Sequence, residues 1–290
     1  MSLQTILLVL NAGLFAMVFT FGLNATVHDA TYLFRRPAEL ARALIAMNVL
    51  MPLFAVSLVL IFDLTPVVRF TLVALSVSPI LPVAPLRILK AGATSASTIG
   101  ILVAASVLAI VLVPLAMVIL GQVFNLPLQM TSASIAILVF TSVLLPLGLG
   151  IAVNSFASTL AKGLAKPIFL ISLIVNLACV VVILFAVAPS MWSLVGNGTV
   201  AAIAGFVIVG LAIGHFFGGP EPENRPALAL STALRYPATV MAIAQVNFPG
   251  EKLVVATVLL YVVINIAVSI PYLLWVKRRQ PQLEVKTSLT

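Results

Sequence analysis

Charged residues are scarce in this sequence. Asp, Glu, Lys and Arg make up only 8% of the 290 residues, whereas a typical soluble domain has about a quarter. Hydrophobic residues make up 62%, and the mean hydropathy is +1.27. This composition excludes a soluble globular protein. The apolar runs are continuous rather than alternating, which favours membrane-spanning helices over a membrane β-barrel.

Cysteine and acidic residues are also few, and each shortage excludes a class of site. The single cysteine, Cys179, lies inside an apolar run, so neither an intrachain disulfide nor a cysteine metal cluster can form. All seven acidic residues fall in loops, at span ends or in the C-terminal tail. No carboxylate is left within a span to carry a proton or balance a metal ion. No catalytic dyad or nucleotide-binding loop is visible, so we expect no enzyme.

Apolar runs long enough to cross a bilayer follow one another along the chain. A span needs about 20 apolar residues. The net charge of +8 lies in small clusters at the ends of these runs, so it indicates membrane topology rather than nucleic-acid binding. The positive-inside rule places the N-terminus outside and the tail, 277–290, in the cytoplasm. The runs predict nine helices, at about 4–25, 39–62, 66–91, 95–120, 131–153, 167–189, 198–217, 227–248 and 253–275.

Prolines should interrupt two of these spans. The third span contains Pro79, Pro82 and Pro85, and the eighth contains Pro237. Proline removes a backbone donor and clashes with the preceding turn, so both spans should break near the middle of the membrane. Broken helices expose backbone groups that a ligand can use.

The two interrupted spans hold corresponding positions in the two halves of the chain. Residues 1–120 carry four spans and residues 131–276 carry five, so that equivalent spans run in opposite directions. This pattern is expected of an inverted repeat within a single transporter domain, 1–290. Paired interruptions point to a transporter whose site lies at the midplane.

Five segments keep the order and spacing of a known family over most of the chain. They are Phe-Thr-Phe-Gly-Leu-Asn at 19–24, Tyr-Leu-Phe-Arg-Arg-Pro at 32–37, Asn-Val-Leu-Met-Pro-Leu at 48–53, and the stretches 78–90 and 230–248. The sequence thereby resembles the bile acid:sodium symporter family, in a nine-helix variant of bacterial type. The last two stretches are similar to that family's two crossover segments.

The resemblance implies a fold and a location. The fold would be all-α, with two inverted repeats, a core domain and a panel domain, and two broken helices that cross. Substrate would bind between core and panel. Family substrates are organic anions such as bile acids, sterol conjugates or keto acids, moved with sodium. The resemblance also implies a bacterial inner membrane.

Two arginines stand where the resemblance would place sodium-binding residues. An acidic residue and a glutamine of the second crossover become Ser231 and Arg235, and a serine and an asparagine of the first become Arg87 and Ile88. Ser106 still matches a hydroxyl ligand. Arginine has five donors, no acceptor and no accessible neutral form, so it should repel sodium. We expect a remnant ion site in which each guanidinium occupies the space and charge of a missing sodium ion.

The residues around the predicted crossing are the expected binding region for the anion. Other interpretations stay open. Arg235 could cap carbonyls of the opposite broken helix, Arg87 could reach the membrane surface, and the asparagines could serve only interhelical hydrogen bonds. Lys90 is interpreted as a positive-inside anchor. The substrate-binding candidates are Arg87, Arg235, Ser231, Thr232, Tyr236, Asn265 and Asn176.

The sequence therefore predicts a secondary transporter that moves an organic anion by alternating access without sodium coupling. The alternatives are an ordinary sodium-coupled symporter, a related carrier of another solute such as a dicarboxylate, and a membrane receptor that does not transport. We expect a small organic anion and the lipid bilayer as partners, with no nucleic acid, no cofactor and no metal apart from the doubted sodium. The oligomeric state stays open.

Overall fold

Helices make up all the regular elements of the part that the structure describes, residues 3–124, 131–196, 198–222, 224–247 and 252–287 of a computed structural model. Phe248, the last residue of the second crossover segment, and residues 288–290 of the predicted tail lie outside these ranges. The first half contains α1 (Leu3–Leu23), α2 (Val27–Thr31), η1 (Leu33–Arg35), α3 (Pro37–Leu44), η2 (Ile45–Leu50), α4 (Met51–Ile61), α5 (Pro66–Val77), α6 (Ala84–Lys90) and α7 (Ser95–Phe124). The second half contains α8 (Ser132–Val139), η3 (Phe140–Leu144), α9 (Leu145–Phe156), α10 (Ser158–Ser193), α11 (Thr199–Phe217), α12 (Asn224–Ala233), α13 (Pro237–Asn247) and α14 (Lys252–Thr287).

Seven helical stretches of the described chain are long and apolar enough to cross a membrane. Each coincides with one of the predicted spans, and many of their large apolar side chains are exposed, as expected of surfaces that face lipid. The other two predicted spans, 66–91 and 227–248, coincide with the shorter pairs α5 and α6, and α12 and α13. The seven are Thr5–Leu23, Pro37–Ile61, Ser95–Gln122, Ser132–Phe156, Ser158–Ser193, Thr199–Phe217 and Leu253–Arg278.

Two of the seven contain a short π-helical segment just before a proline. The segment η2 ends two residues before Pro52, and η3 ends two residues before Pro146. Proline has no backbone N–H and its ring crowds the carbonyl one turn earlier, so the hydrogen-bond ladder widens locally. Neither segment ends its span, because the stretches Pro37–Ile61 and Ser132–Phe156 are each continuous.

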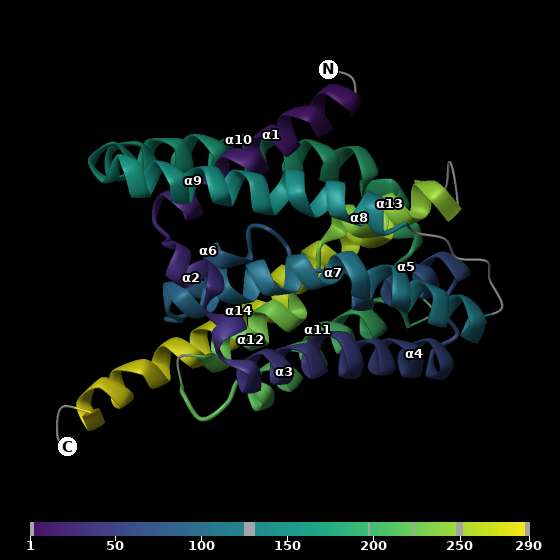
Figure 1. Cartoon of the computed structure of the whole chain (residues 1–290). Helices are drawn as coiled ribbons and strands as arrows, with labels where there is room; N and C mark the ends of the chain where they lie inside the picture. Colours follow the sequence, from purple (N-terminus) through teal and green to yellow (C-terminus); the bar gives the residue numbers. More distant parts are fainter. Residues whose placement is uncertain (1–2, 125–130, 197, 223, 248–251, 288–290) are drawn as a thin grey trace.

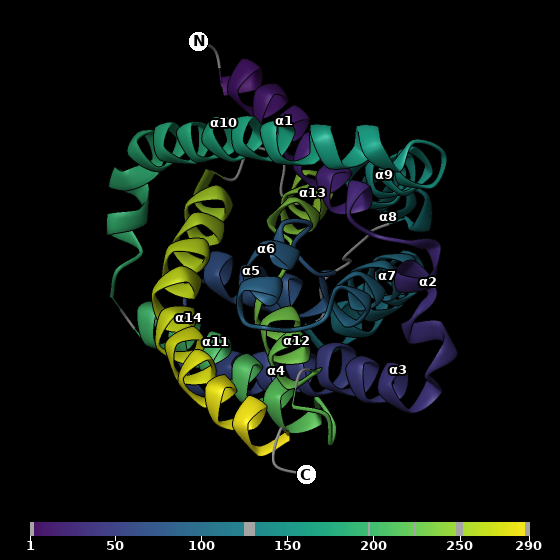
Figure 2. The same ribbon diagram turned by 90° about the vertical axis from the view of Figure 1, so that its left-hand side faces the viewer.

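Three helices form a layer on one side of the molecule. Helix α1 lies against α9 and α10, and we call these three the outer layer (Figures 1 and 2). Gly22 and Gly150 allow the backbones of α1 and α9 to touch, because a Cβ at Gly22 would clash with the carbonyl of Leu147 and one at Gly150 with that of Phe19. Small residues at such a crossing give close packing between helices that lipid alone would not drive together.

Helices α2 to α7 and α11 to α14 form the main bundle, and the α8–η3 segment, which packs on α7 and on α1, lies between the two parts. Helix α11 packs on α12 and α14, and α5 packs on α4, α13 and α14. The outer layer meets the main bundle through α10 on α14 and through the α8–η3 segment on α7. The predicted tail is not a separate element, because α14 continues to Thr287.

The chain between α5 and α6 crosses the chain between α12 and α13. Residues 78–83 and 234–236 are not helical. They pair as a single antiparallel bridge between Ile80 and Arg235. The flanking hydrogen bonds run from the Leu81 N–H to the Leu234 carbonyl, 3.1 Å, and from the Tyr236 N–H to the Pro79 carbonyl, 2.9 Å. Backbone groups of each nonhelical link are therefore partly satisfied by the other link.

Candidate functional site

The guanidinium of Arg235 is fully enclosed at the crossing. The residue is 1% exposed. Its Nε donates to the Thr232 carbonyl at 2.9 Å, its Nη1 to the Ser78 carbonyl at 2.9 Å, and its Nη2 to the Met47 carbonyl at 2.7 Å. These oxygens belong to the end of α12, to the link after α5 and to η2. Arg235 thus connects three separate segments through hydrogen bonds to a single cation.

Two side chains of α14 complete the end of α12. The Tyr261 hydroxyl accepts from the Arg235 backbone N–H at 2.8 Å and donates to the Ala233 carbonyl at 2.5 Å. The Asn265 amide nitrogen donates to the same carbonyl at 2.8 Å. Because Tyr261 and Asn265 are four residues apart on one helix, they reach the same point.

Arg87 joins this cluster from the helix that follows the first link. It lies on α6, is partly buried, and its Nη1 donates to Asn265 Oδ1 at 3.3 Å. Among the described residues neither Arg87 nor Arg235 forms an ion pair with a carboxylate. The two positive charges are therefore held by carbonyl and amide oxygens, and the cluster has no negative side chain.

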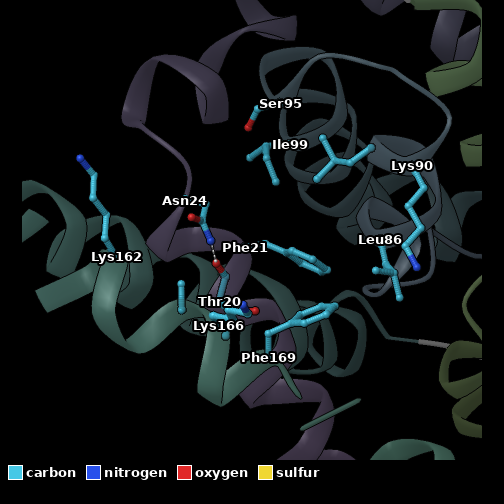
Figure 3. A pocket seen from close by; sticks show the side chains of 12 residues that line it. Thr20, Phe21, Asn24, Leu86, Lys90, Ser95, Ile99, Lys162, Lys166 and Phe169 are labelled. Atoms are coloured by element: carbon cyan, nitrogen blue, oxygen red, sulfur yellow. Dashed lines mark hydrogen bonds between the residues drawn. The ribbon is translucent and has the colours of Figure 1, made fainter. Parts of the chain in front are cut away.

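A cavity of about 540 Å³ lies between the outer layer and the main bundle (Figure 3). Four helices line it, each through residues at helical spacing: α1, α6, α7 and α10. Three of its side chains are cationic, three are neutral polar, and none is acidic. The lining residues are Thr20, Phe21 and Asn24; Leu86, Leu89 and Lys90; Ser95 and Ile99; and Lys162, Ala165, Lys166 and Phe169.

The apolar part of the cavity includes two aromatic rings. Phe21 of α1 and Phe169 of α10 are tilted with their ring centroids 6.5 Å apart, and Figure 3 shows them side by side on one wall. Asn24 is held by its Nδ2, which donates to the Thr20 carbonyl at 2.9 Å. An apolar surface with a few polar groups and an excess of positive charge suits an amphiphilic anion.

The comparison with family models gives one match. The model of the sodium bile acid symporter family matches residues 11–194, which is more than half of the chain. The chain belongs to this family. The match runs from α1 to the end of α10 and includes the first crossover link, Ser106 and every residue that lines the cavity. A comparison with curated proteins found no match.

Membership of the family confirms the resemblance seen in the sequence. Together with the seven apolar helices, it identifies the chain as a multi-pass integral membrane protein of a transporter family. It agrees with the expectation that the chain is not an enzyme. The second crossover segment lies beyond the matched residues.

Most of the substrate-binding candidates lie at the crossing, away from the cavity. None of the seven lines the cavity. Arg87 is on the same helix as Leu86, Leu89 and Lys90, which do line it, but its guanidinium contacts Asn265 instead. Tyr236 is buried, 3% exposed, directly after the bridge at the crossing.

The hydroxyl candidates divide into occupied and unoccupied groups. Thr232 Oγ1 donates to the Leu228 carbonyl of its own helix at 2.7 Å, so it is already used. The hydroxyls of Ser231 and Ser106 are fully buried and have no hydrogen-bond partner among the described residues.

Asn176 lies far along the chain from the crossing, in the outer layer. It is 7% exposed, and its amide lies against Gly13 of α1, with no hydrogen-bond partner among the described residues. A glycine at position 13 leaves room for this side chain, because a Cβ there would overlap the amide oxygen.

Sequence reasoning missed Tyr261 and the cavity. Tyr261 could have been found from its place one turn before Asn265 on an apolar helix. The predicted spans 131–153 and 167–189 leave Lys162 and Lys166 in the loop between them, but α10 begins at Ser158, so both lie on its first turns. Their spacing of four residues puts them on one helix face with Ala165 and Phe169.

Proposed function

We propose that the chain is a secondary transporter of a small organic anion that works by alternating access and does not use sodium. The observation that carries this proposal is the position of the Arg235 guanidinium, which donates hydrogen bonds to three main-chain carbonyls. Carbonyl oxygens are typical ligands of a sodium ion. A covalently attached cation there leaves neither space nor free oxygens for a mobile one.

The architecture that we infer for this transporter has nine spans. The pairs α5 with α6 and α12 with α13 each form one broken span, and the two broken spans cross at the paired links. The halves 1–120 and 131–276 form an inverted repeat, with the outer layer as the panel domain and the main bundle as the core domain. The site then lies where a broken helix meets the panel, as in other carriers built from inverted repeats.

The cavity supports an anionic substrate. Its three lysines have no acidic neighbour in the lining. Its two phenylalanines offer an apolar surface to the uncharged part of the substrate. By the positive-inside rule this lysine-rich end faces the cytoplasm, which places the N-terminus outside. We infer a bacterial inner membrane as the location, on the basis of the family resemblance.

The first test needs no knowledge of the substrate. A ligand that binds only the folded state stabilises it by RT ln(1 + [L]/Kd), about 2.7 kcal/mol when the ligand is at a hundred times its Kd. We expect the melting temperature of the purified protein to be the same in sodium chloride as in the chloride of a bulky organic cation. A clear rise that is specific to sodium would support the conventional symporter instead.

The second test is flux. The purified protein in liposomes is given a panel of labelled organic anions, with sodium or with the inert organic cation outside. We expect equal initial rates in both. Loss of uptake without sodium would contradict the proposal, and binding without flux under any condition would favour a receptor.

A further inference from the structure

The lysines of the cavity are divided between its two opposite walls. Lys162 and Lys166 lie on α10 of the outer layer, whereas Lys90 ends α6 of the main bundle. Figure 3 shows Lys162 and Lys90 on opposite sides of the space, with Phe21 and Phe169 between them. Any movement that closes the cavity by bringing the two groups of helices together therefore brings like charges together.

The described residues provide no counter-charge for these three lysines. No carboxylate lines the cavity. The ion pairs of the described residues include none of these lysines: Asp29 accepts from the Thr26 backbone N–H at 2.8 Å, and Glu39 pairs with Arg36 at 2.7 Å. While the cavity is open to water, solvent and salt screen the lysines. Closure expels that water and strengthens their repulsion.

A bound anion removes this obstacle. A ligand with a single negative charge would leave two of the three cations uncompensated, whereas a ligand with two or more charges can neutralise both walls. Its apolar part would rest on the Phe21 and Phe169 rings. Charge and shape together select a compact organic anion that carries at least two negative groups.

We propose that the protein is an obligate exchanger of organic anions with two or more negative charges, because its empty cavity resists closure. This inference rests on the proposed anion transport. It adds the transport mode, which is exchange, and the substrate class. The loaded carrier closes and reorients, and the empty carrier stays open until another anion binds. Net movement of anion into an empty compartment is then slow.

The experiment compares exchange with net uptake. The purified protein is placed in liposomes that contain either no organic anion or an unlabelled one. The probes are benzenesulfonate and benzenedisulfonate, which are permanently charged and differ by one negative group, with phthalate and succinate as further dianions. Two like charges about 10 Å apart in an effective dielectric constant of about 20 disfavour closure about ten- to twentyfold. We expect uptake of a dianion into preloaded liposomes to exceed uptake into empty ones by at least that factor.

Variants separate the charge from the fold. In Lys90→Gln the preloaded-to-empty ratio should fall severalfold, because the empty carrier can now close, while Lys90→Arg should keep the ratio of the unchanged protein. Lys277→Gln, on the exposed part of α14 outside the cavity, is the matched control and should also keep it. All rates are measured at saturating anion, so that a change in affinity does not imitate a change in ratio.

The possible outcomes distinguish this inference from the function on which it rests. Measurable flux that is equal into empty and preloaded liposomes would overturn exchange and leave anion transport standing. Exchange of benzenesulfonate as fast as of the dianions would overturn the substrate class. No flux of any probe under any condition would count against the proposed function itself, and the exchange mode would fall with it.

Discussion

Replacing Arg235 by alanine tests whether its guanidinium holds the crossing together. The side chain donates to three carbonyls, and a hydrogen bond from a charged donor contributes about 1.5–3 kcal/mol. Three such bonds amount to about 4.5–9 kcal/mol, from which about 3 kcal/mol is subtracted for the cost of placing the guanidinium in the membrane. We therefore expect the free energy of unfolding to fall by about 1.5–6 kcal/mol.

The assay is thermal unfolding of the purified protein in detergent. A loss of this size lowers the melting temperature by roughly 5 °C or more. Millimolar guanidinium chloride should recover part of the loss in Arg235→Ala, because the free cation fits the vacated carbonyls, and should leave the unchanged protein as it is. Arg36→Ala, which removes a half-exposed cation from a surface ion pair, is the control and should melt normally. If Arg235→Ala also melts normally, the guanidinium does not stabilise the crossing and the cation argument fails.

Three further predictions concern the same structure. Gly150→Ala should separate α1 from α9 and reduce both flux and melting temperature, whereas Gly148→Ala on the same helix, where a Cβ meets nothing within 4 Å, should change neither. Tyr261→Phe should lower the free energy of unfolding by about 1–3 kcal/mol, measured by thermal unfolding, because it strands the Arg235 backbone N–H and leaves the Ala233 carbonyl with the Asn265 donor alone. Ser231→Ala and Ser106→Ala should each leave the melting temperature within about 2 °C of the unchanged protein, because these hydroxyls have no partner among the described residues to lose; a large fall would point to a ligand that holds them.

The membrane-transporter class could be predicted from the sequence because long apolar runs dictate helical spans whatever their neighbours are. The prolines also marked helix ends: α5 ends at Val77, just before Pro79, and α13 begins at Pro237. Both signals are local, so a linear sequence contains them.

The contacts at the site could not be predicted in the same way. The sequence left Arg235 open to interpretation as a substrate contact or as a cap for carbonyls. It does not reveal which carbonyls lie within reach of the guanidinium once the two links pair. The structure places the guanidinium on three carbonyls, of which only that of Ser78 belongs to the opposite link. Lysines at span ends likewise satisfy the positive-inside rule whether or not they face a cavity, so Lys90 gave no sign of a second role.

The paired links at the crossing also set an order for the assembly of the protein. Ile80 and Arg235 are 155 positions apart, 235 minus 80. At a synthesis rate of about 5–20 residues per second, the partner of the first link emerges roughly 8–30 s later. During that interval the backbone groups of the first link must be satisfied by water or by the insertion machinery, because lipid cannot do so. The first half therefore cannot reach its final form while it is alone in the membrane, and the chain matures only once its last quarter has been made.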